Sequence, residues 1–220
     1  FSEGSYTLYV QERDAAGNWS SSSSSTIVID TTAPTSNLIG INSGASYTPS
    51  TSVALSLNSK GASSMRFKND SGTYTTYESY ATSKSWILSS TEGTRMVSVE
   101  FKDAAGNSTA VSDTIVLDTT APTMTLSSSD VAVGGTYNGP VTMTFISSES
   151  TNNFSVGDVT VSDAFISDFS QVHSTVYTAI ITPSGSTPVL VKVEASQFTD
   201  GVGNNNTVSN IYNWTQDTTP

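Results

Sequence analysis

The chain has 220 residues and a formal net charge of −11, with 8 Lys and Arg against 19 Asp and Glu. Phosphate binding requires clustered Lys and Arg, so this balance argues against nucleic acid as a partner. Cysteine is absent, which excludes disulfide bonds, thiolate metal sites and cysteine nucleophiles. No apolar run approaches the roughly 20 residues that a membrane helix needs, so we expect no membrane contact in this segment.

The first 30 residues predict a β-hairpin. Residues 1–29 contain two strands around the loop Asp14–Asn18, and an isolated hairpin is marginally stable in water at best. We therefore expect residues 1–30 to be the last two strands of a preceding domain, in a window of a longer array. The alternative is that this hairpin is donated to a neighbouring subunit by strand addition.

Residues 31–118 have the period-two alternation of apolar and polar residues that half-buried strands show. Turn-forming residues such as Asn69–Gly72 separate the alternating stretches. The predicted core positions are Val53, Leu55 and Leu57; Met65 and Phe67; Trp86 and Leu88; Val97, Val99 and Phe101; and Ile115 and Leu117.

Residues 119–217 repeat the scheme, and residues 218–220 are predicted to begin the next linker. The predicted core positions here are Val141, Met143 and Phe145; Val159 and Val161; Val176 with Ala179 or Ile180; Val189, Val191 and Val193; and Ile211 with Tyr212 or Trp214. No long stretch has the helical period. The chain is therefore predicted to be all-β, with tandem immunoglobulin-like antiparallel β-sandwiches at 31–118 and 119–217.

One pair of motifs recurs along the chain, a DAAGN loop and, one strand later, a DTTAPT linker. The copies are Asp14–Asn18 with Asp30–Thr35, Asp103–Asn107 with Asp118–Thr123, and a divergent Asp200–Asn204 with Asp217–Pro220. The spacing of the linkers fits one sandwich of about 100 residues per repeat. We expect Gly106 to adopt the positive φ of a tight hairpin loop, and Pro34 and Pro122 to stiffen the linkers.

With these motifs placed, the chain resembles the bacterial immunoglobulin-like repeat domains of large secreted adhesins and other surface proteins. In residues 31–118 the resemblance rests on Met65–Phe67, Trp86–Leu88, Val97–Asn107 and Asp118–Pro122. In residues 119–217 it rests on Phe154–Val161 and Phe198–Asn204, which resemble another subgroup of the same class. The resemblance implies an extracellular location, on the bacterial cell surface or secreted.

Because the same modules serve as spacers, adhesive tips and appendages of secreted enzymes, the resemblance leaves several functions open. We expect a structural stalk segment without catalytic activity, whose partners are neighbouring Ig-like domains of the same chain. One alternative is a subunit of an extracellular filament or sheath, assembled from identical subunits by strand donation. Another is an accessory module of a secreted enzyme that contacts a host or matrix glycan or protein.

Calcium at the domain junctions is the one cofactor that the sequence suggests, because some related giant adhesins use it. In an immunoglobulin-type sandwich the first strand begins at the end that carries the loops with Glu149 and with Asp200 and Asn204. Asp118 is therefore expected to approach these residues and form an oxygen shell. Asp30 would meet Asp103 and Asn107 in a site with fewer ligands. The alternative for both sites is turn and linker hydrogen bonding without an ion.

Other residues have weaker functional patterns. Tyr74, Tyr77 and Tyr80 lie close together and could contact a glycan or a protein partner, or complete the edge of the sandwich. His173, the single histidine, is interpreted as a surface-loop residue because nothing nearby suggests a catalytic group. Asp163 and Asp168 form a pair with little specificity for glycoside hydrolysis. Lys192 and Glu194 share an exposed strand face, which argues against a buried isopeptide crosslink.

Overall fold

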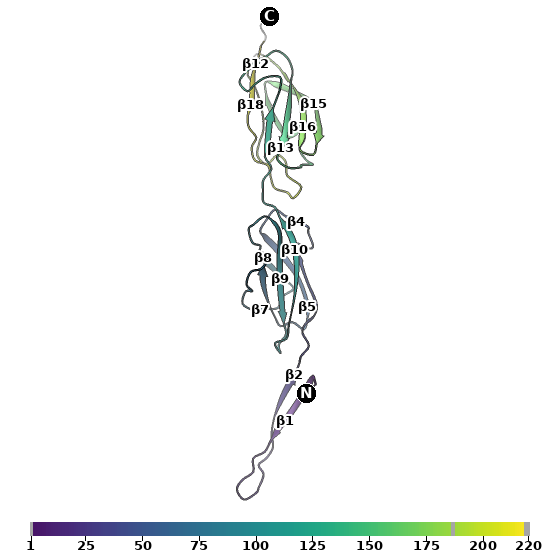
Figure 1. The fold of residues 1–220 in the computed structure, drawn as a ribbon, viewed down its shortest axis with the longest axis vertical. Helices are drawn as coiled ribbons and strands as arrows, with labels where there is room; N and C mark the ends of the chain where they lie inside the picture. The colour runs from purple at the N-terminus through teal and green to yellow at the C-terminus, as the bar shows by residue number, and fades with distance from the viewer. Residues whose placement is uncertain (1, 186–187, 218–220) are drawn as a thin grey trace. The chain divides into compact units, whose positions relative to one another are not determined.

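The computed structural model describes residues 2–185 and 188–217; the predicted linker start at 218–220 lies outside these residues. Within them the chain is all-β, and its one helical element is a 3-10 turn at Val156–Asp158, so no described helix could span a membrane. The strands form five sheets (Figure 1). The chain divides into two compact units, one formed by Phe1–Ser46 and Ser50–Leu117, the other by Tyr47–Pro49 and Asp118–Pro220.

The N-terminal hairpin forms a two-stranded sheet of its own, in which β1 (Gly4–Val10) pairs antiparallel with β2 (Ser23–Ile29). Tyr6 lies opposite Ile27 in this register, so one face of the hairpin is apolar. Tyr6, Leu8, Ile27 and Ile29 line a shallow depression on that face. Leu8 and Ile27 are 58% and 51% exposed, respectively, so nothing in the described chain covers the depression.

The first sandwich comprises eight strands in two sheets. One sheet has the order β4-β10-β9-β6-β7 and the other the order β3-β5-β8. The strands are β3 (Thr35–Ile41), β4 (Tyr47–Thr48), β5 (Ser52–Lys60), β6 (Ser64–Asn69), β7 (Glu78–Ser79), β8 (Ser83–Ile87), β9 (Gly93–Lys102) and β10 (Ser108–Leu117).

The core of the first sandwich follows the predicted alternation. Residues of β5 with odd numbers are buried and those with even numbers are exposed, as a strand with one face on the core requires. Every predicted core residue of this sandwich is buried except Trp86, which is partly buried against the core. Trp86 stacks at a tilt on Phe67, with the two ring centroids 5.3 Å apart.

The second sandwich also has eight strands, in sheets of order β11-β13-β16-β15 and β12-β18-β17-β14. The strands are β11 (Met124–Ser127), β12 (Thr136–Tyr137), β13 (Val141–Ser147), β14 (Val159–Ser162), β15 (Ala164–His173), β16 (Val176–Pro183), β17 (Pro188–Val193) and β18 (Tyr212–Gln216). Phe154 packs at its centre, against the rings of Phe145, Tyr177 and Phe198.

One strand of the second sandwich has its faces assigned differently from the prediction. In β16 the inward residues are Tyr177, Ala179 and Ile181, whereas Val176 and Ile180 are only partly buried. Tyr177 lies opposite Phe145 of β13, and this register fixes the parity of the whole strand. In β18 the inward pair is Tyr212 and Trp214, and the preceding Ile211 is 52% exposed.

Candidate metal centre

The DAAGN loop of the first sandwich is closed by its own first residue. Oδ1 of Asp103 accepts hydrogen bonds from the backbone N–H groups of Gly106 (2.7 Å) and Asn107 (2.9 Å). Oδ2 of Asp103 accepts a third from Nδ2 of Asn107, at 2.9 Å. Gly106 has φ +103°, which confirms the predicted left-handed position and explains why the motif has glycine there.

The other two copies of the loop have the same geometry. In the hairpin, Asp14 accepts from the backbone N–H (2.8 Å) and the side-chain Nδ2 (3.0 Å) of Asn18. In the second sandwich, Oδ1 of Asp200 accepts the backbone N–H groups of Val202, Gly203 and Asn204, and its Oδ2 accepts Nδ2 of Asn204. The divergent sequence DGVGN therefore keeps the two residues that close the loop.

In each of the two sandwiches the asparagine of the loop also holds a linker. Nδ2 of Asn107 donates to the backbone carbonyl of Asp30 at 3.1 Å, and Nδ2 of Asn204 donates to that of Asp118 at 2.9 Å. A side-chain amide has two N–H donors, so one goes to the loop aspartate and the other to the linker. Asn107 and Asn204, which were candidate oxygen ligands, thus act here as hydrogen-bond donors. Their contact explains physically why the loop and linker motifs recur together.

Three carboxylates converge beside the second of these contacts. Ligand oxygens of Asp118, Glu149 and Asp200 all lie within 4.8 Å of one another, as the sequence analysis anticipated from the ends of the sandwich. Ca²⁺ binds oxygen at 2.3–2.6 Å, so two ligands on opposite sides of one ion lie about 5 Å apart. The three side chains come from the linker, the loop after β13 and the DGVGN loop, and the donor set fits a hard divalent cation.

Basic residues are scarce in the part of the chain that contains this cluster. Residues 118–217 contain nine acidic residues and a single basic one, Lys192. Nζ of Lys192 lies 2.5 Å from Glu194, with which it forms an ion pair. Three neighbouring carboxylates repel one another, and a bound cation offsets that repulsion.

Asp200 is the most buried member of the cluster, with 5% of its surface exposed. Burial raises the pKa of its carboxyl, but the hydrogen bonds from Asn204, Gly203 and Val202 outweigh this effect, so the pKa lies below its usual range. The group is therefore ionised at neutral pH. Its Oδ1 already accepts three hydrogen bonds, whereas Oδ2 accepts one from Asn204, so Oδ2 is the atom that can face an ion.

The corresponding position in the first unit has fewer acidic groups. Asp30 and Asp103 line one small cavity, but the third charged residue there is Lys60. No group of three acidic, histidine or cysteine ligands forms around Asp30 within residues 2–185 and 188–217. This position therefore brings together fewer acidic ligands than the position around Asp118.

The three candidate tyrosines lie in different surroundings. Tyr80 packs edge-on against the core residue Phe101, with ring centroids 6.0 Å apart, and its hydroxyl accepts the backbone N–H of Ser59. Tyr80 therefore completes the sandwich, which was one of the two expectations for the group. Tyr74 and Tyr77 instead lie on the outside of the sheet, where Arg66 contacts both rings.

The remaining candidates do not come together into a site. His173 is exposed at the end of β15, which confirms its interpretation as a surface residue. Asp163 and Asp168 are exposed and adopt positive φ angles at two irregular points of the chain. Lys192 and Glu194 pair with each other on the outer face of the sheet and not with the core.

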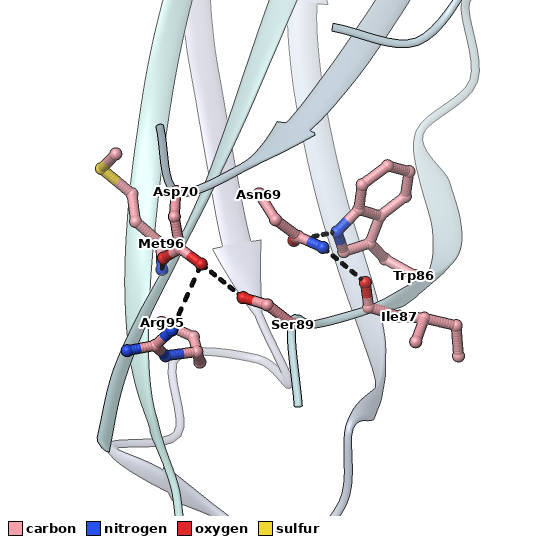
Figure 2. Close-up of polar contacts among 7 residues, drawn as sticks. All are labelled: Asn69, Asp70, Trp86, Ile87, Ser89, Arg95 and Met96. Atoms are coloured by element: carbon pink, nitrogen blue, oxygen red, sulfur yellow. Dashed lines mark hydrogen bonds and ion pairs between the residues drawn. The ribbon is translucent and has the colours of Figure 1, made fainter. Parts of the chain in front are cut away.

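The sequence analysis treated Asn69–Gly72 only as a turn, but two of its side chains connect the sheets of the first sandwich. Figure 2 shows Asn69 and Asp70, at the end of β6, reaching to separate partners. Asn69 Oδ1 accepts Nε1 of Trp86 at 2.6 Å, and Asp70 accepts the Ser89 hydroxyl and the backbone N–H of Met96. Trp86 is on β8 of the opposite sheet and Ser89 follows that strand, so the bonds of Asn69 to Trp86 and of Asp70 to Ser89 form an inter-sheet latch. Met96 is on β9, in the same sheet as β6.

Comparisons with known proteins identify the second sandwich. Residues 118–215, less than half of the chain, match the family model of the bacterial Ig-like domain. The match supports the resemblance on which the fold prediction rested. No curated protein matches the chain.

Several solved structures are similar at low identity. Fibronectin(III)-like modules of Clostridium thermocellum CbhA share 13% identity over 81% of this chain and 95% of theirs, with a TM-score of 0.38. Invasin, a bacterial integrin-binding protein, shares 11% identity over 84% of this chain and 40% of its own, with a TM-score of 0.32. A tetra-tandem repeat from the extending region of a large adhesion protein shares 15% identity over 96% of this chain and 57% of its own, with a TM-score of 0.33. At such values the likeness does not bear on function.

Proposed function

We propose that this chain is a structural segment of a bacterial extracellular surface protein, in which Ig-like domains follow one another and calcium fixes a linker to the domain that it enters. The observation that carries the proposal is the convergence of Asp118, Glu149 and Asp200 on a domain of the bacterial Ig-like family. The acidic, cysteine-free composition suits an extracellular, calcium-containing environment.

In this proposal the chain's own groups hold the linker and the ion adds to them. Asn204 holds the backbone of Asp118, and Asp118 Oδ1 accepts the N–H of Thr120, so the linker carboxylate has a fixed position. Asp118, Glu149 and Asp200 would bind Ca²⁺ with waters completing the six to eight oxygens it prefers. The ion would join the linker to two loops, so the start of the second domain would be more rigid with calcium than without it.

Calcium-dependent stability tests the proposal. We expect 1 mM CaCl2 to raise the Tm of the second domain relative to EDTA, and Asp118→Asn to abolish most of the difference. The matched control is Asp168→Asn, which removes the same charge from an exposed position whose positive φ asparagine tolerates. If calcium leaves the Tm of the unmodified chain unchanged, or if both variants respond to calcium alike, the proposal is wrong.

A second candidate function, strand donation within a filament, is favoured by the apolar face of the hairpin. The hairpin can be aligned with the last two strands of the first sandwich by matching Asp14 to Asp103 and Asp30 to Asp118. In this alignment, apolar hairpin residues match residues of the first sandwich that are at most 1% exposed. These pairs are Leu8 and Val97, Val10 and Val99, Ile27 and Ile115, and Ile29 and Leu117. The hairpin therefore has the side chains of a final strand pair that requires the rest of a sandwich.

Two origins of that remaining sandwich give different assembly behaviour. Residues 1–30 are proposed as the last two strands of a preceding Ig-like domain, whose other strands would come from the same polypeptide. In the filament alternative they would come from a neighbouring subunit. Size-exclusion chromatography with light scattering, with and without residues 1–29, separates the two. Polymers that disappear on deletion of residues 1–29 support donation, and monomers before and after deletion contradict it.

A further inference from the structure

Five side chains form an alternating ladder of cations and aromatic rings on the first sandwich. Nζ of Lys68 lies 4.9 Å from the ring centroid of Tyr74, and Cζ of Arg66 lies 4.7 Å from the same centroid. Cζ of Arg66 also lies 4.6 Å from the ring centroid of Tyr77. Nζ of Lys102 lies 3.6 Å from that second centroid. The order is thus Lys68, Tyr74, Arg66, Tyr77, Lys102, which we call the cation ladder.

The register of the sheet makes the ladder linear. Lys68 and Arg66 occupy alternate positions of β6, and Lys102 of β9 lies opposite Ser64, the next alternate position. Successive positions on one face of a strand are about 7 Å apart, so the three cations follow the strand direction at about that interval. The segment after β6 places Tyr74 and Tyr77 between them.

The two ends of the ladder are lysines and carry positive charge. Arg66 forms an ion pair with Glu100, which also accepts the Tyr77 hydroxyl at 2.6 Å. In the part of the chain that the structure describes, Lys68 and Lys102 form no ion pair. Two ammonium groups are therefore held over aromatic rings, half-buried and outside these ion pairs, although the chain as a whole has a net charge of −11.

This arrangement decides what kind of ligand the surface suits. Cations cover faces of Tyr74 and Tyr77, so those faces do not stack on a sugar or a base, and the surface presents positive charge instead. A row of charges fits a linear polymer better than a single carboxylate. DNA carries one charge per 1.7 Å or so, far denser than the interval of about 7 Å between these cations, so a polymer with more widely spaced charges matches the row better.

We propose that the cation ladder binds a linear acidic polysaccharide, a chain of uronic-acid sugars whose carboxylates contact Lys68 and Lys102. The Debye length of about 8 Å at physiological salt screens the acidic remainder of the protein, so the local charge of the ladder dominates at contact. This inference goes beyond the structural role proposed above and does not depend on the calcium site.

Binding of the intact chain to polygalacturonate, measured by biolayer interferometry in EDTA, tests the inference. EDTA removes calcium-bridged contacts, and fully methyl-esterified polygalacturonate is the ligand control, because it keeps the sugar rings and loses their charge. We expect binding to the acidic form only, weakening as salt rises. Lys68→Gln and Lys102→Gln should each weaken it about threefold to fivefold, since an exposed ion pair contributes up to about 1 kcal/mol.

Further variants and polymers separate ligand binding from a purely structural role for the ladder. Lys192→Gln removes a cation from the second sandwich, where it pairs with Glu194, and should leave binding unchanged. Lys102→Arg keeps the charge of the ladder and should retain binding. Equal binding of the esterified polymer, equal binding of polyglutamate or single-stranded DNA, or unchanged binding in the double variant Lys68→Gln/Lys102→Gln would each overturn the inference. The inference is also wrong if the unmodified chain binds no acidic polymer and the double variant merely lowers the Tm, because the ladder would then only stabilise the fold.

Discussion

The contact between Asn204 and the linker gives the sharpest stability prediction. Replacing Asn204 with alanine removes both donors of its side-chain amide at once. One of them bonds the carboxylate of Asp200 at 2.8 Å, and the other bonds the carbonyl of Asp118 at 2.9 Å. The substitution therefore weakens the loop and releases the linker in a single step.

The expected cost follows from the burial of the two acceptors. A hydrogen bond to a charged group contributes about 1.5–3 kcal/mol, and Asp200 is only 5% exposed, so water replaces the lost donor poorly. The Asp118 carbonyl belongs to a partly exposed linker that water can reach, and its bond contributes about 0.5–1 kcal/mol. We therefore expect Asn204→Ala to lower the free energy of unfolding of the second domain by about 2–4 kcal/mol.

Urea unfolding in EDTA measures this cost without any contribution from a metal. The buried Trp214 reports the second domain if Trp19 and Trp86 are first replaced by phenylalanine. Asn205→Ala is the matched control, because Asn205 is the exposed neighbour in the same loop and should cost less than about 0.5 kcal/mol. If the two alanine variants are equally stable, the asparagine contact does not hold the linker.

Three further predictions concern the loops and the latch. Because hydrogen bonds depress the pKa of Asp200, its stabilising contribution is complete above the unfolded-state pKa of about 3.9 and is lost as pH falls through the lower folded-state value. Urea midpoints below pH 4 should therefore fall more steeply in the unmodified chain than in Asp200→Asn. Gly203→Ala, at φ +109°, should cost the second domain about 1–2 kcal/mol by thermal unfolding. Gly201→Ala, in the same loop with open space around it and no positive φ, should be nearly neutral. Asp70→Ala should destabilise the first domain by about 2 kcal/mol in urea unfolding, because the Ser89 hydroxyl and the Met96 N–H lose their acceptor. A loss of stability below about 0.5 kcal/mol would contradict the inter-sheet latch.

The features that the sequence predicted well depend on local rules. Strand β5 alternates strictly between apolar and polar residues, so its buried face is legible from the sequence. The DAAGN loop requires a left-handed residue at a fixed place, and Gly106 is the residue that supplies it. The general order of loops at the ends of an immunoglobulin-type sandwich sufficed to bring Asp118, Glu149 and Asp200 together.

The features that the sequence could not predict depend on partners distant in the chain. In β16 apolar residues occupy both parities, so only pairing with β13 decides that Ile181 faces inward and Ile180 does not. The amide of Asn204 can present either an oxygen or two N–H donors, and the linker carbonyl selects the donors. The sequence analysis did not find the cation ladder because Lys68 and Lys102 lie on two different strands, β6 and β9. Its tyrosines lie in the segment between β6 and β7.

The most direct test of the central claim is isothermal titration of the calcium-free chain with Ca²⁺. The account predicts one site per chain, abolished in Asp118→Asn and kept in Asp168→Asn and in Asp30→Asn, because Asp30 has Lys60 where Asp118 has a third carboxylate. The account is contradicted if Ca²⁺ produces neither heat of binding nor a shift in Tm. It is also contradicted if Asp118→Asn binds Ca²⁺ as the unmodified chain does.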